Sequence, residues 1–284
     1  MSLLTRNLRR ALWEWRSHLP GSVSCGVTLR ATALIACYNE TRARNVGPQV
    51  RHLLHCPFIE RVVISNHNPD LVLDGAILQD PRVFIVEQAV RRGCGHRWTV
   101  ARTFDPEYLI TIDDDILLYP AQVARLFEQL VLDPSVPHGL SGMWRDDSTE
   151  FKFVERHEVE VDFLCETYAL TRHHLSRYWK VRAELAADGV ADLIDGAMDF
   201  VVISQMGDGR PRIHDLGRLR RCETFAEVGI AVHRNADFGT AFHQVWGALQ
   251  ARHVGSNAPD SAWDGPVRDV NAQPARDGNR SLAR

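Results

Sequence analysis

Four short apolar runs recur between residues 31 and 118, and stretches with helical spacing separate them. Each run holds four to six apolar residues without clean alternation, which is typical of strands that are covered on both faces. The pattern therefore predicts an α/β fold with a mostly parallel central sheet and helices on both faces. The predicted strands are residues 32–39, 61–67, 82–88 and 108–115.

The rest of the chain predicts one further strand and several helices. A strand is expected over 159–171, and helices are expected from near Thr41, over 120–131, over 191–206 and over 236–252. On the helix at 191–206, Asp192, Asp195 and Asp199 are expected to share one face. The folded domain is predicted to span 31–252.

Two terminal segments differ from this pattern. Residues 1–30 are predicted to form an amphipathic helix and a linker, with Leu4, Leu8, Leu12 and Trp15 on one stripe of the helix at 3–16. That helix either docks on its own domain or makes a peripheral contact with a membrane surface. Residues 253–284 are polar and rich in Pro and Gly, which predicts a disordered tail.

Composition excludes several classes of function. A net charge of −3 gives no reason to expect a nucleic acid partner. Lys152 and Lys180 are the only lysines, so there is no lysine of a phosphate-binding loop. The six cysteines lack metal-site spacing and are interpreted as reduced core residues. With no apolar run of membrane-spanning length, a cytoplasmic protein is expected.

Three consecutive acids, Asp113 to Asp115, follow the strand at 108–115. They could cap the helix that begins near Pro120, but one acid would be enough for a cap. Ligands of parallel α/β sheets bind at the carboxyl ends of the strands, where Asn39, Asn66 and Gln88 also lie. Because strand side chains alternate, Asp113 and Asp115 are expected to point together toward a Mn²⁺ or Mg²⁺ ion, with Asp114 on the other side.

Five segments of the chain, taken in order, resemble those of a known protein family. The ordered segments "CYNE", "VVISN", "RRGCGHRW", "YLITIDDDILL" and "IDGAMDFVV" resemble the catalytic domain of the exostosin family over about residues 31–250. That family comprises metal-dependent retaining glycosyltransferases of family 64, which have the nucleotide-sugar-binding fold called GT-A. The resemblance implies the same fold and the same kind of reaction here.

The resemblance also implies roles for single residues. It places Asp195 at the reacting carbon as the catalytic residue, and His233 beside Asp113 and Asp115 as a metal ligand. Asp199, one turn further along, is expected to matter less. Glu40 departs from the family, which usually has arginine there, and Ile194 replaces the first of two acids. The residues implied to bind the nucleotide sugar are Tyr38, Asn39, Asn66, Arg92, Arg97, Asp113, Asp114 and Arg234.

The sequence thus predicts a retaining hexosyl- or N-acetylhexosaminyl-transferase. Its donor would be a nucleotide diphosphate sugar, with UDP as the expected nucleotide, and its acceptor would be a glycan or a small hydroxyl compound. A nucleotidyltransferase is an alternative, although the glycine- and lysine-rich loop of that class is missing. A domain that binds nucleotide sugar or glycan without turnover is another, because Glu40 and Ile194 depart from the family.

Overall fold

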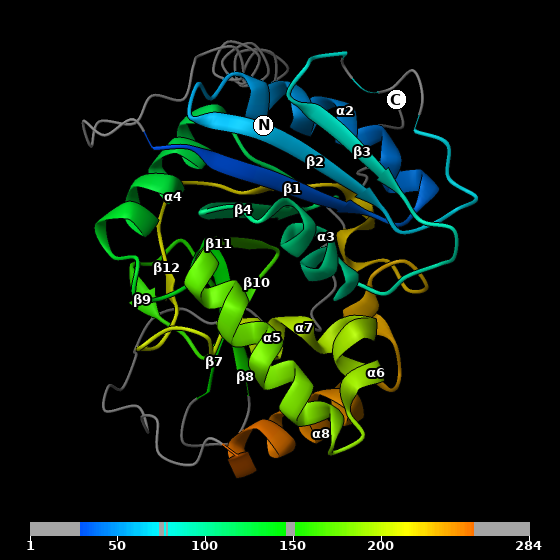
Figure 1. Ribbon diagram of the computed structural model, residues 1–284, viewed down its shortest axis with the longest axis vertical. Coiled ribbons are helices and arrows are strands. Elements are labelled where there is room, and N and C mark those ends of the chain that lie inside the picture. Colours follow the sequence, from blue (N-terminus) through cyan, green and yellow to red (C-terminus); the bar gives the residue numbers. More distant parts are fainter. Residues whose placement is uncertain (1–28, 74–76, 78, 146–150, 253–284) are drawn as a thin grey trace, which may run out of the picture.

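The computed structural model describes residues 29–73, 77, 79–145 and 151–252 (Figure 1). Within these residues, a central sheet has the strand order β3-β2-β1-β4-β11-β6-β12-β9. β1 (Ala31–Cys37) pairs in parallel with β2 (Ile59–Asn66) and β4 (Tyr108–Asp113), and β2 pairs in parallel with β3 (Val83–Glu87). β11 (Thr167–Thr171) runs antiparallel to β4. The remaining strands are β6 (His138–Gly139), β12 (Arg212–Ile213) and β9 (Val159–Glu160).

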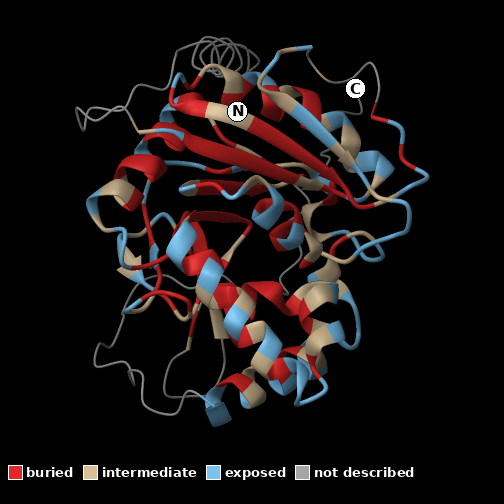
Figure 2. Ribbon diagram, viewed as in Figure 1, coloured by how far each residue is buried: buried red, intermediate tan, exposed pale blue. Residues whose placement is uncertain are grey.

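Helices cover both faces of this sheet, as the apolar runs predict. Alternate residues of β1 face opposite sides: Ala33 and Ile35 pack with α2 and α4, and Leu34 packs with α3, α5, α7 and α8. The central strands are accordingly buried in Figure 2. The helices are α2 (Glu40–Leu54), α3 (His96–Phe104), α4 (Pro120–Leu132), α5 (Arg172–Ala186), α7 (Asp199–Ile203) and α8 (Phe238–Arg252).

Smaller elements follow β4 and complete the domain. β5 (Ile116–Leu117) pairs with β13 (Arg220–Arg221), which brings the chain after residue 220 back to the end of β4. A three-stranded sheet contains β7 (Ser141–Arg145), β8 (Phe151–Glu155) and β10 (Phe163–Cys165). Two short 3₁₀ helices, η2 (Glu223–Ala226) and η3 (Val232–Arg234), precede α8.

Two predicted elements are broken into shorter pieces. The strand expected over 159–171 is three strands, β9, β10 and β11. The helix expected over 191–206 consists of α6 (Ala191–Leu193), a π-helical turn η1 (Ile194–Met198), and α7. A π-helical turn holds an extra residue, so the helical spacing from Asp195 to Asp199 is lost. Asp199 is buried with 2% of its side chain exposed, whereas Asp195 is 45% exposed, and the prediction of a shared face is wrong.

The π-helical turn is held by the glycine-rich segment before α3. The amides of Cys94 and Gly95 donate to the carbonyls of Gly196 and Asp195, at 2.8 and 3.1 Å. A Cβ atom on Gly93 would lie 2.3 Å from the Asp195 carbonyl oxygen, so only glycine fits there. The segment "GCG" therefore serves close backbone packing.

The predicted helix at 3–16 and the predicted tail at 253–284 lie outside the described residues. None of the helices in the described part of the chain has the length and apolarity needed to cross a membrane.

Candidate metal and nucleotide site

Asp113 to Asp115, hereafter the acidic turn, lie where strand β4 passes into a turn, and none of them is on a helix. β4 ends at Asp113, and β5 begins at Ile116. The next helix, α4, begins at Pro120, its N-cap residue is Tyr119, and its first turn has no acidic residue. Asp113 to Asp115 therefore do not cap α4, and the capping interpretation is wrong.

One polar face of α2 holds this turn. Arg42, Asn45, Gln49 and His52 have the spacing of a single helical face. Asn45 donates to the Asp114 carbonyl at 2.8 Å, and Gln49 donates to the Asp113 and Ile116 carbonyls at 2.7 Å each. The His52 ring bonds to the Leu118 carbonyl at 2.7 Å. From the other side, the Cys222 amide donates to the Asp115 carbonyl at 2.8 Å. Hydrogen bonds to the backbone of this segment, from α2 on one side and from Cys222 on the other, thus fix the position of the acids.

The side chains around the turn form three units, in each of which one arginine bridges two acids. The nine side chains are largely buried, and Asp113 is the most exposed of them at 28%. Six carboxylates therefore share three guanidinium groups. The units are Arg97 with Asp113 and Asp199, Arg42 with Asp114 and Asp115, and Arg221 with Glu155 and Glu166.

Arg97 and Asp199 form the deepest unit. Arg97 Nη1 lies 2.5 Å from Asp113 Oδ1, and Arg97 Nε lies 3.3 Å from Asp199 Oδ2. Asp199 also accepts from the Trp98 indole at 2.8 Å. Burial raises the pKa of Asp199, and the charge of Arg97 opposes that rise. Asp199, which sequence reasoning ranked below Asp195, is thus the acid of the 191–206 segment that connects to the turn.

Arg221 reaches the turn through the pairing of β13 with β5. It lies 2.6 Å from Glu155 Oε2 and 2.5 Å from Glu166 Oε1. Glu166 has a left-handed backbone conformation, with φ of 64°, which is unusual for a residue other than glycine. Its carbonyl accepts from the Asp113 amide at 2.9 Å. Strain of this kind persists only where surrounding contacts hold it, and here they hold Glu166 beside the acidic turn.

The three carboxylates do not follow the expectation that Asp113 and Asp115 point to one side and Asp114 to the other. Arg42 Nη1 lies 3.2 Å from Asp114 Oδ1 and 3.0 Å from Asp115 Oδ2, so these two acids share one partner while Asp113 pairs with Arg97. The expected alternation fails because the strand ends at Asp113. Burial raises the pKa of Asp115 well above its usual range, the charge of Asp113 raises it further, and Arg42 opposes both.

One oxygen of the turn fits a cation. Asp115 Oδ1 is buried and has no hydrogen-bond partner, which is costly for a carboxylate. In the part of the chain that the structure describes, no three His, Cys, Asp or Glu side chains gather as a ready metal site. His233, on η3, is exposed. Partial loss of solvent and the charges of Arg234 and Arg42 lower its pKa. The donors fit Mg²⁺ or Mn²⁺ bound by one or two carboxylates and completed by a diphosphate.

The other predicted binding residues lie at the strand ends but differ in accessibility. Tyr38, after β1, is 44% exposed, and Asn68 donates to its carbonyl at 3.1 Å. Asn39 is the N-cap of α2 and accepts from the Thr41 amide at 2.8 Å. Asn66 is fully buried and donates to the Leu71 carbonyl and to Glu87. Arg92 is exposed beside the 93–95 turn. Of these residues, Tyr38 offers an accessible aromatic face.

Asp195 is held away from the turn. Its carboxylate pairs with Arg182 on α5, whose Nε lies 2.7 Å from Oδ1 and whose Nη2 contacts Oδ2. Its backbone carbonyl contacts Gly95, two residues before Arg97. Asp195 is therefore linked to the acidic turn through the start of α3 rather than by direct contact of its side chain.

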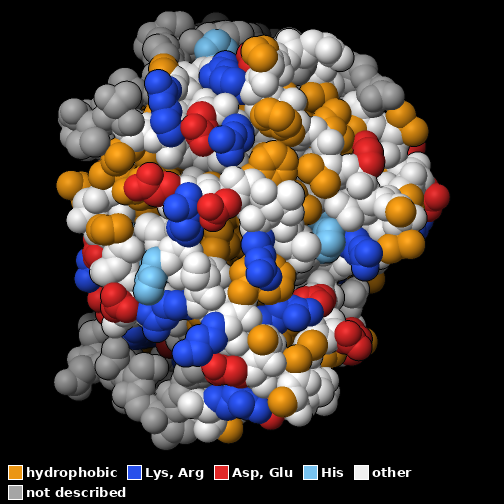
Figure 3. Space-filling view, viewed as in Figure 1, with side chains coloured by type: hydrophobic (Ala, Val, Ile, Leu, Met, Phe, Trp, Pro, Cys, Tyr) orange, Lys and Arg blue, Asp and Glu red, His pale blue; other side chains and the backbone are white. Residues whose placement is uncertain are grey.

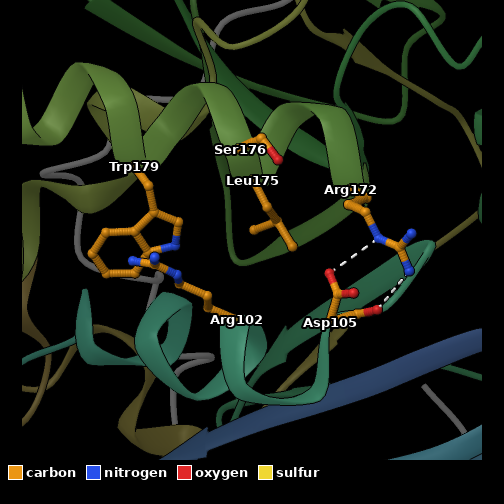
Figure 4. A pocket seen from close by; sticks show the side chains of 6 residues that line it. All are labelled: Arg102, Asp105, Arg172, Leu175, Ser176 and Trp179. Atoms are coloured by element: carbon orange, nitrogen blue, oxygen red, sulfur yellow. Dashed lines mark hydrogen bonds and ion pairs between the residues drawn. The ribbon is translucent and has the colours of Figure 1, made fainter.

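A groove of about 310 Å³ lies at the other end of β4, between α3 and α5 (Figure 4). The Arg102 guanidinium lies over the Trp179 ring, 5.3 Å from its centroid, and Arg172 pairs with Asp105 at 3.0 Å. On the face shown in Figure 3, basic and acidic side chains are interspersed. The groove lies near the amino end of β4 and is separate from the acidic turn.

Sequence reasoning missed Arg42, Glu166 and Arg221. The spacing of the polar residues on α2 could have revealed Arg42, because these residues face a turn that needs partners. Arg221 has no such signal, since β13 is two residues long. Glu166 is identified only by its backbone conformation and its partners.

No protein-family model matches the chain, and no curated protein matches it. A search of solved structures does find similar folds. A crystal structure of GalNAc-T7 with UDP, GalNAc and Mn²⁺ matches with a TM-score of 0.51 and 11% identity. The match covers 68% of this chain and 44% of that one, so this chain spans less than half the length of the GalNAc-T7 chain.

A second solved structure is CMP:2-keto-3-deoxy-manno-octonic acid synthetase with CTP, at a TM-score of 0.37 and 13% identity. It covers 56% of this chain and 86% of that one, and a likeness this low does not define a shared fold. The first likeness does: the protein has a GT-A-type fold, with a mostly parallel central sheet flanked by helices. At 11% identity it does not single out the exostosin family.

Proposed function

We propose that this protein is a metal-dependent retaining glycosyltransferase that moves a sugar from a nucleotide diphosphate sugar, with UDP as the expected nucleotide, to an acceptor hydroxyl. The observation that carries the proposal is the acidic turn at the end of β4 in a GT-A fold. There, six carboxylates share three arginines and Asp115 Oδ1 has no partner. Such a cluster favours a divalent cation, because a cation supplies positive charge that the arginines do not.

The residues around the turn have distinct proposed roles. Asp115 and Asp113 hold the cation, and His233 is the candidate third ligand from η3. The cation, when bound, stabilises negative charge on the departing diphosphate. Arg97, beside Asp113, orients the acid and adds positive charge on the same side. Asp114, which accepts from the Tyr38 amide at 3.4 Å, links the turn to the end of β1.

Tyr38 is the proposed contact for the nucleotide base. Its ring is accessible at the carboxyl end of β1, and Arg91, which pairs with Asp70 at 2.7 Å, also interacts with the Tyr38 phenol. A flat aromatic side chain held in this way provides a stacking surface. Asn39, Arg92 and Arg234 remain proposed donor contacts. The buried Asn66 is proposed to shape the loop after β2 through its bonds to Leu71 and Glu87.

Asp195 is the proposed acid on the acceptor side. Its carboxylate pairs with Arg182, and we assign it an electrostatic or orienting role, in which it stabilises positive charge at the reacting carbon or positions the acceptor hydroxyl. The same ion pair favours a second candidate function, namely binding of nucleotide sugar without turnover. Transfer to an acceptor distinguishes the two candidates.

The test compares binding of UDP, GDP and CDP with and without Mn²⁺, using calorimetry on wild type and on Asp115→Asn. Wild type is expected to bind UDP only when Mn²⁺ is present, and the variant is expected to lose that metal-dependent binding while its apo fold is retained. Asp208→Asn is the matched control, because Asp208 is an exposed acid paired with Arg177. Equal binding of UDP with Mn²⁺ by the variant and by wild type would refute the metal site. Binding without transfer from any donor sugar would favour the binding domain.

A further inference from the structure

Arg42 fills the space between the acidic turn and the chain that returns through η2. Its guanidinium contacts Asp114 and Asp115 at 3.2 and 3.0 Å, and its side chain is 11% exposed. On its other side, Nε donates to Thr224 Oγ1 at 3.3 Å and Nη2 donates to the Thr224 carbonyl at 3.0 Å. One side chain thus joins α2, the acidic turn and η2.

This position sets up a competition. A divalent cation bound by Asp115 would lie next to the guanidinium, because both use the carboxylate of the same residue. Two positive groups that contact the same buried carboxylate repel each other strongly. Moreover, Arg42 already neutralises carboxylate charge that the cation would neutralise in its absence. The cation therefore gains less from the acidic turn while Arg42 remains there.

A diphosphate changes the balance. Its oxygens suit a guanidinium, which binds phosphate through paired hydrogen bonds. A diphosphate at the end of β4 would give Arg42 a new anionic partner while completing the coordination of the metal. Arg97 does not offer the same exchange, since it is fixed between Asp113, Asp199 and the Cys94 carbonyl.

We propose that Arg42 is a built-in cation that competes with the divalent metal for Asp115, and that a nucleoside diphosphate relieves this competition by binding the guanidinium. The inference rests on the proposed function, because it concerns the same metal and the same donor. Its consequence is positive coupling, in which the metal and the diphosphate each bind more tightly in the presence of the other. The acidic turn then holds metal tightly only with donor or product present.

The experiment measures Mn²⁺ binding from the electron paramagnetic resonance signal of the free ion, with and without UDP. It uses wild type, Arg42→Gln and the control Arg44→Gln, since Arg44 is an exposed arginine on the same helix. Arg42→Gln is expected to bind Mn²⁺ alone about tenfold more tightly than wild type, within the usual range of coupling between sites. With Mn²⁺ saturating, the same variant should bind UDP more weakly. Arg44→Gln should change neither value.

Tighter binding of Mn²⁺ alone, together with weaker binding of UDP in the presence of Mn²⁺, would identify the competition. Loss of a merely structural contact would weaken both ligands, and that result, like an unchanged affinity for Mn²⁺, would overturn the inference while leaving the proposed function intact. If wild type binds neither Mn²⁺ nor UDP with Mn²⁺, both proposals fail. Should Arg42→Gln not fold, Arg42→Lys keeps the charge but loses the fork that reaches Thr224. Because the charge is kept, this variant should bind Mn²⁺ alone no more tightly than wild type, and it should bind UDP with Mn²⁺ more weakly because lysine lacks the paired phosphate bonds. Tighter binding of Mn²⁺ alone by Arg42→Lys would refute the competition.

Discussion

The two ends of β4 carry the same kind of interaction in opposite surroundings. Near its amino end, Asp105 pairs with Arg172, and their side chains are 72% and 54% exposed. At its carboxyl end, Asp114 pairs with Arg42, and their side chains are 7% and 11% exposed. Exposed pairs contribute about 0–1 kcal/mol to stability, whereas charges taken out of water cost several kcal/mol each before any pairing.

This difference shows where function is expected. Stability alone gives a domain little reason to bury six acids with three arginines, since well-packed apolar residues are often at least as stable. Buried charges with strongly perturbed pKa values are more frequent at functional sites than elsewhere. The amino end has a groove and exposed pairs (Figure 4), but the charge there is already screened by water. The comparison therefore supports the proposal that the chemistry takes place at the carboxyl end.

The largest expected effect comes from removing the cation of the deepest unit. Arg97→Met should lower the free energy of unfolding by about 3–5 kcal/mol at pH 7, because it leaves Asp199 as an uncompensated buried acid. Urea denaturation measures this change. The double variant Arg97→Met with Asp199→Asn should recover part of the loss, since asparagine carries no charge and still accepts from Trp98. A loss below 1 kcal/mol for Arg97→Met would mean that burial does not distinguish the two ends.

An intermediate effect is expected at Asp195, where it should appear in activity rather than in stability. Asp195→Asn keeps the size of the side chain but removes its charge, and Arg182 is already 22% exposed, so folding should change little. Sugar transfer should fall about 10²-fold or more, while the affinities for nucleotide and metal stay at wild-type values. The measurements are initial rates of transfer together with calorimetry. Asp192→Asn, an exposed acid on neighbouring α6, is the control.

Two outcomes at Asp195 would be informative. Transfer near the wild-type rate would remove Asp195 from the catalytic machinery and leave the acidic turn as the functional site. A parallel loss of nucleotide binding would show that the Asp195 carboxylate, through its pair with Arg182, helps to hold the π-helical turn against the start of α3.

The sequence was sufficient to predict the four parallel strands of the sheet, β1 to β4, and the position of the acids at the end of β4, for a physical reason. Strands covered on both faces have continuous apolar runs, so β1, β2 and β4 were visible, and the acids at the end of β4 stood out against them. The sides of the helical segment on which Asp195 and Asp199 lie could not be predicted in this way. It depends on a π-helical turn held by backbone bonds from residues 94 and 95, about a hundred positions earlier.

The arginines were hidden for a different reason. Nearly all basic residues in this chain are arginine, so no single one is conspicuous. Arg42 could have been recognised from its spacing with Asn45 and Gln49, because a polar stripe on a helix that packs against a sheet needs buried partners. Arg221 reaches Glu166 only after β13 pairs with β5, and a two-residue strand leaves no periodic pattern.

The smallest expected effect is at the amino end of β4. Asp105→Asn removes the carboxylate that pairs with Arg172, but the Asp105 carbonyl still accepts from Arg172 Nη2 at 2.8 Å. Asp105 also ends α3 in a left-handed conformation, with φ of 44°, which asparagine tolerates well. The substitution should therefore change the free energy of unfolding by less than about 0.5 kcal/mol and leave the affinity for UDP with Mn²⁺ unchanged. Urea denaturation and calorimetry measure the two values.

If Asp105→Asn instead destabilised the protein as much as Arg97→Met, exposure would not separate the two ends of β4. A selective loss of nucleotide affinity in this variant would mean that the groove between α3 and α5 belongs to the binding site.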